Sequence, residues 1–267
     1  MPAARGAPLS LPAPNPGFHW SSESWGDALR CRELTATAQH LFTSKQLALP
    51  APEAWQAATA SLGATPDRLM KVKQVHANGV RVLKKGQVPD DASAQRPDAD
   101  AIISNQPGLV LAVMVADCVP ILLADSRNGA AAAIHAGWRG TCARVASTAI
   151  DLMRREFGTD PADLVAAIGP SVGGDDYEVG EALVAAFELA GHDRKHIDRW
   201  FTRPGGKLHL DLWAANVDQL IDAGLDAGDI FLCGLSTVSH PEIFDSYRVA
   251  GEKAGRMAGM IRVPEAT

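Results

Sequence analysis

The chain has few of the residues that build disulfide frameworks or basic surfaces. Its 267 residues include four scattered cysteines with no Cys-x-x-Cys pair: Cys31, Cys118, Cys142 and Cys233. So few cysteines exclude a disulfide scaffold and favour a reducing compartment such as the cytoplasm. With 25 basic against 31 acidic residues, a formal charge of -6 and no dense Lys/Arg cluster, we expect no nucleic-acid partner.

Long apolar runs are also missing. Residues 109–116 are apolar, but Asp117 ends the run far short of the ~18–20 residues that cross a membrane, so no membrane partner is expected. Prolines interrupt the first 17 residues wherever a signal peptide needs a continuous apolar segment. We therefore predict a partly flexible N-terminal extension over residues 1–40 and a single domain over residues 41–267.

Apolar periodicity predicts alternating strands and helices, and 46% apolar residues suffice for a buried core. Strands are predicted at residues 98–103, 109–116, 119–124, 129–135, 164–168, 208–212, 230–233 and 257–263. Helices are predicted at residues 25–42, 51–62, 141–157, 181–190 and 213–223. Asn78-Gly79 predicts a hairpin between short strands, residues 87–96 a loop, and Pro120 an interruption of its strand. The alternation indicates an α/β fold.

Two polar interruptions follow buried strands and place reactive side chains at strand ends. Asp117-Cys118 follows residues 109–116, and His135-Ala-Gly-Trp-Arg-Gly140 follows an alanine-rich strand. With His76, these residues form a candidate zinc site, because three protein ligands leave a fourth position for water or substrate. The separations of 42 and 17 residues match no compact zinc motif. On spacing alone, a buried cysteine with two hydrogen-bonded histidines is favoured.

The same residues also fit a thiol hydrolase. Cys118 would be the nucleophile and His135 the base, with Asp100 or Asp117 orienting the imidazole. For both aspartates a structural role in a turn, a cap or an ion pair is the default.

Arg139 and Arg248 are the cations expected near a substrate anion. Arg139 lies at a predicted helix N-terminus, where backbone amides also favour anions. Surface arginines are common, so for both residues a purely structural place is equally consistent with the pattern.

The order of the motifs is similar to that of a known family. The motifs are Lys73-Gln-Val-His76, Ala116-Asp-Cys-Val-Pro120, His135-Ala-Gly-Trp-Arg-Gly140, Ile168-Gly-Pro170, Tyr177-Glu-Val179 and Ser246-Tyr-Arg248. From about residue 41 to residue 263 the chain resembles the YfiH family, also called the laccase-domain or multicopper polyphenol oxidase family.

The resemblance implies a single α/β domain of mixed β-sheets packed sandwich-like with surrounding helices. It implies a Zn²⁺ cofactor held by His76, Cys118 and His135. It also implies a purine nucleoside phosphorylase that takes adenosine, inosine, guanosine or methylthioadenosine with phosphate and deaminates adenosine. Multicopper oxidation fits poorly, because a trinuclear copper cluster needs several His-x-His pairs and the chain has none among its eight histidines.

Three positions depart from the family pattern. Lys45 stands where the family carries an arginine near the substrate, so it is a candidate substrate contact that keeps the charge but not the planar fork. Ser171 replaces a cysteine, and Val249 replaces a second arginine. These departures leave the three metal positions intact and bear on substrate preference.

The sequence thus predicts a cytoplasmic zinc enzyme of purine nucleosides with small-molecule partners. The alternatives are an amidase-type enzyme that edits a peptidoglycan precursor, a Cys-His thiol hydrolase, and a zinc-stabilised binding module.

Overall fold

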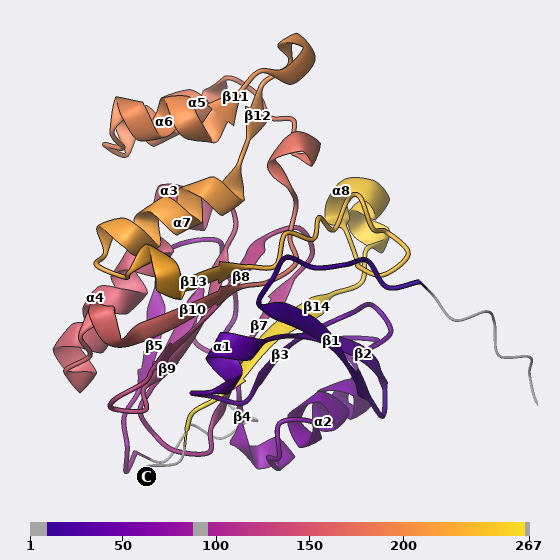
Figure 1. Cartoon of the computed structure of the whole chain (residues 1–267), viewed down its shortest axis with the longest axis vertical. Helices are drawn as coiled ribbons and strands as arrows, with labels where there is room; N and C mark the ends of the chain where they lie inside the picture. The colour runs from indigo at the N-terminus through magenta and orange to yellow at the C-terminus, as the bar shows by residue number, and fades with distance from the viewer. Residues whose placement is uncertain (1–9, 88–95, 265–267) are drawn as a thin grey trace, which may run out of the picture.

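The computed structural model describes residues 10–87 and 96–264. Two six-stranded sheets pack against each other, and helices cover their outer faces (Figure 1). This arrangement confirms the predicted α/β domain of mixed sheets packed as a sandwich. No helix in the described ranges has the length and apolar character to cross a membrane.

The first sheet contains the hairpin near the N-terminus and the last strand of the chain. Its strands, in spatial order, are β1 (Phe18–Glu23), β2 (Gly26–Cys31), β3 (His40–Thr43), β14 (Met257–Arg262), β7 (Val110–Val115) and β4 (Leu69–Met70). All neighbours are antiparallel except β4 and β7. Residues 18–31, which lie within the predicted N-terminal extension, therefore form the edge of this sheet.

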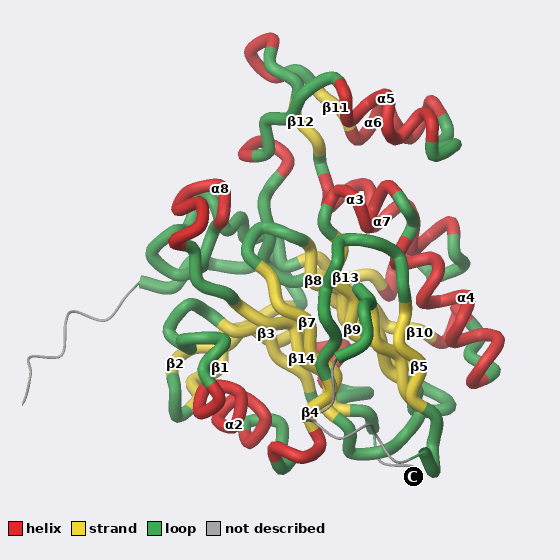
Figure 2. Tube along the Cα trace, turned by 180° about the vertical axis from the view of Figure 1, so that it is seen from behind, coloured by secondary structure: helices red, strands yellow, loops and turns green. Residues whose placement is uncertain are grey.

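The second sheet is built from the middle of the chain. Its spatial order is β13 (Ile230–Leu232), β10 (Leu164–Ile168), β8 (Val119–Asp125), β9 (Ala131–Ala136), β6 (Ala101–Ser104) and β5 (Val80–Leu83). A small ribbon of β11 (Phe201–Thr202) and β12 (His209–Leu210) stands apart from both sheets (Figure 2). β8 pairs antiparallel with both β9 and β10, so it is an interior strand.

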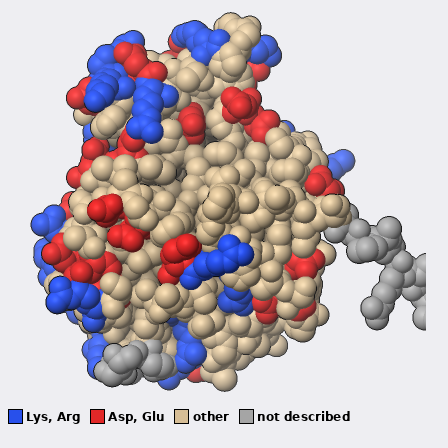
Figure 3. Space-filling model, in the orientation of Figure 1, with Lys and Arg blue, Asp and Glu red and all other residues tan. Residues whose placement is uncertain are grey.

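Helices flank the sandwich on both sides. They are α1 (Arg32–Thr35), α2 (Pro52–Ala60), α3 (Trp138–Cys142), α4 (Val145–Phe157), α5 (Ala182–Leu189), α6 (Arg194–Trp200), α7 (Leu212–Asp222) and α8 (Tyr247–Ala250). α2 lies against the first sheet, α4 and α7 lie beside the second, and α5, α6 and the small ribbon form a projecting lobe (Figures 1 and 2). On the face drawn in Figure 3, basic and acidic side chains are interspersed.

The central strands are apolar on both faces because each face packs on a different layer. Along β8, Ile121 and Leu123 belong to the core under the helices, whereas Leu122 and Ala124 belong to the core between the sheets. These four side chains are fully buried. The predicted interior strands are therefore confirmed, with small shifts of their ends.

Three local predictions are wrong. Residues 25–42 form β2, α1 and β3 rather than a helix. The neighbours Ala28 and Leu29 on β2 face different cores, so both are apolar and the sequence lacks the apolar–polar alternation that marks a strand. The hairpin at Asn78-Gly79 is absent: β4 pairs with β7 in the first sheet and β5 with β6 in the second. The helix predicted over 141–157 is divided into α3 and α4 at Arg144, whose φ is 57°.

The strand around Pro120 is also more regular than predicted. Pro120 is the second residue of β8 and lies opposite His135, so the backbone break comes before it, at Asp117. Most of the predicted loop over 87–96 lies outside the described residues.

The burial of His40 on β3 of the first sheet can be tested through its titration. Its imidazole is fully buried on β3, where Nε2 accepts a hydrogen bond from the Cys31 N–H and Nδ1 faces the Ala38 carbonyl at 3.0 Å. Burial, with Arg30 and His19 nearby, lowers the pKa of His40 to about 4. The imidazole is therefore neutral in the folded protein down to this pH.

We expect the free energy of unfolding to fall as the pH drops from 6.5 to 4, because His40 is protonated in the unfolded chain but stays neutral when buried in the folded protein. The stabilisation from neutral His40 is fully present above pH 6.5, and its loss is on the order of 3 kcal/mol. Urea unfolding followed by tryptophan fluorescence measures it. His40→Leu should show a shallower pH dependence in this window, and equal slopes for both proteins would contradict the prediction.

Candidate metal centre

His76, Cys118 and His135 come together where the two sheets meet. Their ligand atoms all lie within 4.8 Å of one another, and the two imidazole rings are nearly perpendicular, with centroids 4.8 Å apart. His135 is buried, Cys118 half-buried and His76 exposed. The sequence-predicted ligand set thus forms one cluster with an accessible side.

The cluster forms because two of its members lie on connections between the sheets. Cys118 ends the short connection from β7 of the first sheet to β8 of the second, and His76 lies between β4 and β5. His135 is on β9, beside the start of β8. The two connections between the sheets and the end of β9 therefore meet at the same edge of the sandwich.

Gly137 is required by close packing at this edge. β8 and β9 are paired through Val119 and Ala136, which brings Gly137 alongside Cys118. A Cβ atom on Gly137 would lie 2.8 Å from Cys118 Sγ and 3.4 Å from a ring carbon of His76. Only a glycine fits between the two candidate ligands, which explains this position of the His-Ala-Gly-Trp motif.

The carboxylate of Asp100 holds two of the three candidate ligands. It is fully buried at the start of β6, and Oδ1 lies 2.8 Å from Nδ1 of His135. The same carboxylate accepts backbone N–H bonds from His76 at 2.9 Å, Ala77 at 2.7 Å and Val75 at 3.3 Å. Because Nδ1 of His135 donates to Asp100, Nε2 is left to face the cluster.

The electrostatics of the cluster favour a thiolate. Burial alone raises the pKa of Cys118, but hydrogen bonds and positive charge from His135 and His76 outweigh it and lower this pKa to about 6. For His135, burial opposes the charged form, and the bonds to Asp100 and Cys118 raise its pKa above the usual range. The same arrangement serves a metal ligand and a nucleophile.

The donor set fits zinc. One thiolate and two imidazoles are ligands that zinc takes in proteins, and tetrahedral bonds of about 2.0–2.3 Å place ligand atoms about 3.5 Å apart. In the cluster the ligand atoms lie within 4.8 Å of one another, so small side-chain movements would bring them to this spacing. Asp100 also supplies the carboxylate that commonly orients a ligating histidine.

A cavity of about 470 Å³ opens directly over the cluster. Trp138, Tyr177, Val172, Met114 and Leu212 contribute apolar surface to it. Burial, with the charge of Cys118 nearby, raises the pKa of Tyr177 to about 12, so its hydroxyl stays protonated. The volume and the mixed lining are those of a small-molecule site.

Three guanidinium groups line the same cavity. Arg139 lies over the Trp138 ring at 4.2 Å, and Arg248 over the Tyr177 ring at 5.0 Å. Arg256, directly before β14, is a third cavity arginine; it belongs to the family-like motif Gly255-Arg-Met-Ala258, for which the sequence predicted no role. Lys45 does not line the cavity, and its amine donates to the Pro241 carbonyl.

Asp117 links the cluster to Arg248. Its φ is 81°, its Oδ1 accepts from the Thr237 hydroxyl at 2.6 Å, and its Oδ2 accepts from the Arg248 N–H at 2.6 Å. This agrees with the predicted capping role, since Ser246-Tyr-Arg248 begins α8. The imidazole is oriented by Asp100, one of the two aspartates considered for that role.

The fold and the Cys-His cluster together define an α/β sandwich with a candidate metal centre between its sheets. Residues 51–264 match the family model described as multi-copper polyphenol oxidoreductase laccase, and the chain belongs to this family. The family resemblance seen in the sequence is thereby confirmed.

Relatives with named activities cover most of the chain. A purine nucleoside phosphorylase of Bacteroides thetaiotaomicron is 38% identical over 202 residues, 74% of each chain. Adenosine deaminase RL5, from an unknown prokaryotic organism, is 35% identical over 75% of this chain and 78% of its own. The crystal structure of the hypothetical protein YfiH of Bacillus licheniformis superposes with a TM-score of 0.83 at 24% identity, covering 93% of this chain and 99% of that one.

We predict that Asp100→Asn lowers zinc affinity about 10- to 100-fold, because the amide cannot accept all the bonds that the carboxylate accepts. Competition with a chromophoric chelator measures the affinity, and circular dichroism checks folding. Asp98→Asn is the matched control, because Asp98 is exposed and pairs with Lys73. Equal zinc affinities for the two variants would contradict the assigned role of Asp100.

Proposed function

We propose that the protein is a zinc-dependent enzyme that cleaves purine nucleosides with phosphate and also deaminates adenosine. The observation that carries the proposal is the opening of the His76–Cys118–His135 cluster into a cavity that combines aromatic and guanidinium groups. The activities named for its relatives support the same reading.

The cavity offers complementary surfaces for the two parts of the reaction. The aromatic and aliphatic side chains suit a purine, which is flat and largely apolar on its faces. The three arginines suit phosphate, because a guanidinium binds two phosphate oxygens through parallel N–H bonds. Phosphate and nucleoside therefore bind in one cavity, where the phosphate can approach the ribose.

Each protein group has a distinct role in this proposal. Arg139, Arg248 and Arg256 bind phosphate and offset its charge as it approaches the anomeric carbon. The protonated Tyr177 hydroxyl donates a hydrogen bond to the substrate. His76, Cys118 and His135 would hold the metal, and zinc bound there supplies a Lewis acid towards an electronegative substrate atom.

The decisive assay measures adenine and hypoxanthine release from adenosine and inosine, with and without phosphate, by zinc-replete protein. We expect base release to require phosphate, inosine to form from adenosine without it, and Cys118→Ala to lower both rates by about 100-fold or more. If zinc-replete protein releases neither base, or Cys118→Ala matches the wild type, the proposal fails.

The thiol-hydrolase alternative has one specific observation in its favour, the Cys118–His135–Asp100 series with a low thiol pKa. It predicts a metal-free enzyme that alkylation inactivates. The zinc proposal predicts loss of activity with a chelator and recovery with zinc. Both treatments belong in the same assay.

Arg256 provides a test of phosphate binding. Its NH1 donates to the Ala254 and Gly255 carbonyls at 3.0 and 2.8 Å, which holds the guanidinium at the cavity wall. We expect Arg256→Lys to raise the KM for phosphate about tenfold, with a smaller effect on the KM for inosine, because lysine loses the fork.

Lys45→Gln is the comparison for Arg256→Lys, because Lys45 is the cation that the sequence suggested. Its amine lies outside the cavity lining, so the change in phosphate KM should be smaller than for Arg256→Lys. A larger effect at Lys45 than at Arg256 would reverse the assignment.

A further inference from the structure

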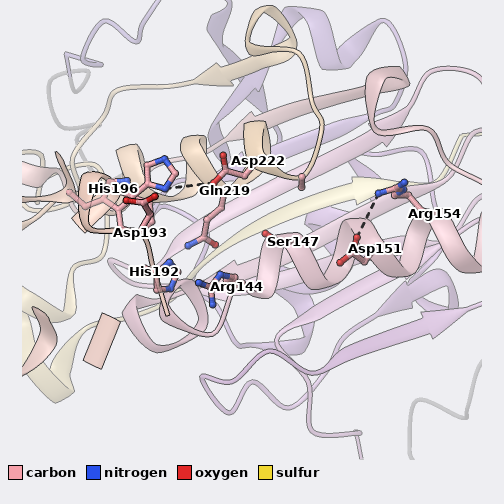
Figure 4. Close-up of a pocket in the computed structure, with 11 residues that line it drawn as sticks. Arg144, Ser147, Asp151, Arg154, His192, Asp193, His196, Gln219 and Asp222 are labelled. Atoms are coloured by element: carbon pink, nitrogen blue, oxygen red, sulfur yellow. Dashed lines mark ion pairs between the residues drawn. The ribbon is translucent and has the colours of Figure 1, made fainter. Parts of the chain in front are cut away.

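Two of the remaining cavities differ in how they relate to the candidate metal centre. The cavity between α4, α7 and the segment before α6 shares no lining residue with the cavity over Cys118 (Figure 4). A wider cavity of about 760 Å³ shares Trp138, Tyr177 and Arg248 with the cavity over Cys118. These three side chains form a wall common to both, and we call the wider space the adjoining cavity.

The adjoining cavity contains a carboxylate that no cation neutralises. Asp176 and Glu178 both line it, and Glu178 pairs with Lys207 at 2.7 Å. Among residues 10–87 and 96–264, the Asp176 carboxylate is bonded only to the hydroxyls of Ser236 and Ser239. Both hydroxyls donate to Oδ2, at 2.5 and 2.6 Å, so Oδ1 makes no hydrogen bond and remains accessible. A neutral group that carries hydroxyl donors suits this atom.

Asp176 shares its support with the candidate metal centre. Ser236, which donates to Asp176, is followed by Thr237, whose hydroxyl donates to Oδ1 of Asp117 at 2.6 Å. Asp117 directly precedes Cys118. Hydroxyls on two neighbouring residues thus hold the carboxylate of the adjoining cavity and the aspartate beside the candidate ligand, which fixes the separation of the two carboxylates.

The partners of Asp176 are themselves held in place. Ser236 is 8% exposed, and its Oγ accepts the Gly173 N–H at 3.2 Å. Backbone pairing between Ser171 and Ser236 holds the same segment. A carboxylate oriented in this way loses little freedom when a ligand binds to it.

The two cavities differ in the charge that they offer. Arg139 and Arg256 line only the cavity over Cys118, and Asp176 lines only the adjoining cavity. Phosphate is therefore favoured on the first side and disfavoured beside Asp176, because like charges repel. Arg248 belongs to the common wall, where an anion on one side meets a neutral, hydroxylated group on the other.

Resting on the phosphorolysis proposed above, we propose that Asp176 binds the ribose and makes the enzyme selective for ribonucleosides over 2′-deoxyribonucleosides. Oδ1 of Asp176 accepts a hydrogen bond from the 2′-hydroxyl. A carboxylate that accepts from a ribose hydroxyl is a recurrent contact in nucleotide sites, and its charge strengthens the bond. The 2′-hydroxyl neighbours the anomeric carbon, so the bond strengthens as positive charge develops there.

The ratio of kcat/KM for inosine to kcat/KM for 2′-deoxyinosine tests the proposal, measured as hypoxanthine release with phosphate and zinc-replete protein. We expect the wild type to prefer inosine about 10- to 100-fold. Equal values for the two nucleosides overturn the role of Asp176 and leave the proposed phosphorolysis intact. Release of base from neither nucleoside overturns the proposed function, and the role of Asp176 with it.

Asp176→Asn tests the assigned contact. The two serine hydroxyls keep the amide oxygen of asparagine, so its NH2 group replaces Oδ1 and the acceptor for the 2′-hydroxyl is lost. We expect the ratio to fall about tenfold, through slower turnover of inosine rather than faster turnover of 2′-deoxyinosine. Asp175→Asn makes the same charge change on an exposed neighbour outside the cavity lining and should leave the ratio unchanged.

Ser239→Ala provides a second variant, because Ser239 is exposed and its removal leaves the Asp176 carboxylate with one orienting hydroxyl. We expect the ratio to fall about two- to fivefold. Thermal unfolding checks that each variant folds, and Ser239→Ala decides the question if Asp176→Asn does not. An unchanged ratio in the variant that decides overturns the proposal, and a lower ratio with Asp175→Asn unchanged supports it.

Discussion

The buried carboxylate of Asp100 is the constraint on which the candidate metal centre depends. It accepts from the imidazole of His135 and from three successive backbone N–H groups at 75–77, so a single side chain fixes one candidate ligand directly and another through its backbone. A fully buried carboxylate is stable only with such partners, because its desolvation cost is large. The cluster and the carboxylate therefore depend on each other: Asp100 orients the ligands, and their N–H groups satisfy its charge.

The two-sheet fold determines where the three candidate ligands lie. The crossings from β7 to β8 and from β4 to β5 bring Cys118 and His76 to one edge, while paired β8 and β9 place His135 opposite Pro120. Asp117 then joins the connection between β7 and β8 to the loop that carries Thr237 and to Arg248 of α8. The candidate ligands and Arg248 are thus connected through rigid strands and short hydrogen bonds, which give the cavity a defined geometry.

The sequence predicted the parts of the molecule that depend on local pattern. Interior strands such as β7 and β8 are recognisable because both faces are apolar. Cys118 and His135 stand out at strand ends, whereas the set with His76 follows only from the resemblance of the motif order to a known family. The failures depend on pairing at a distance. Asn78-Gly79 looks like a hairpin turn until β4 and β5 join different sheets, and Arg256 enters the cavity only because β14 returns from the C-terminus beside β7. Lys45, just after β3, lies outside the cavity lining, and its amine donates to the Pro241 carbonyl.

The backbone conformations at the candidate metal centre indicate that the protein's own contacts hold it in this arrangement. His76 and Asp117 have φ values of 58° and 81°, which cost on the order of 1–3 kcal/mol each for residues with a Cβ atom. Protein contacts offset this cost: the Asp100 carboxylate accepts the His76 N–H, and the Asp117 carbonyl accepts the Val172 N–H at 3.0 Å. Since these contacts are made within the protein itself, metal binding need not supply the energy to form the site. Metal binding then need not drive folding, which suits an enzyme better than a module that zinc must fold.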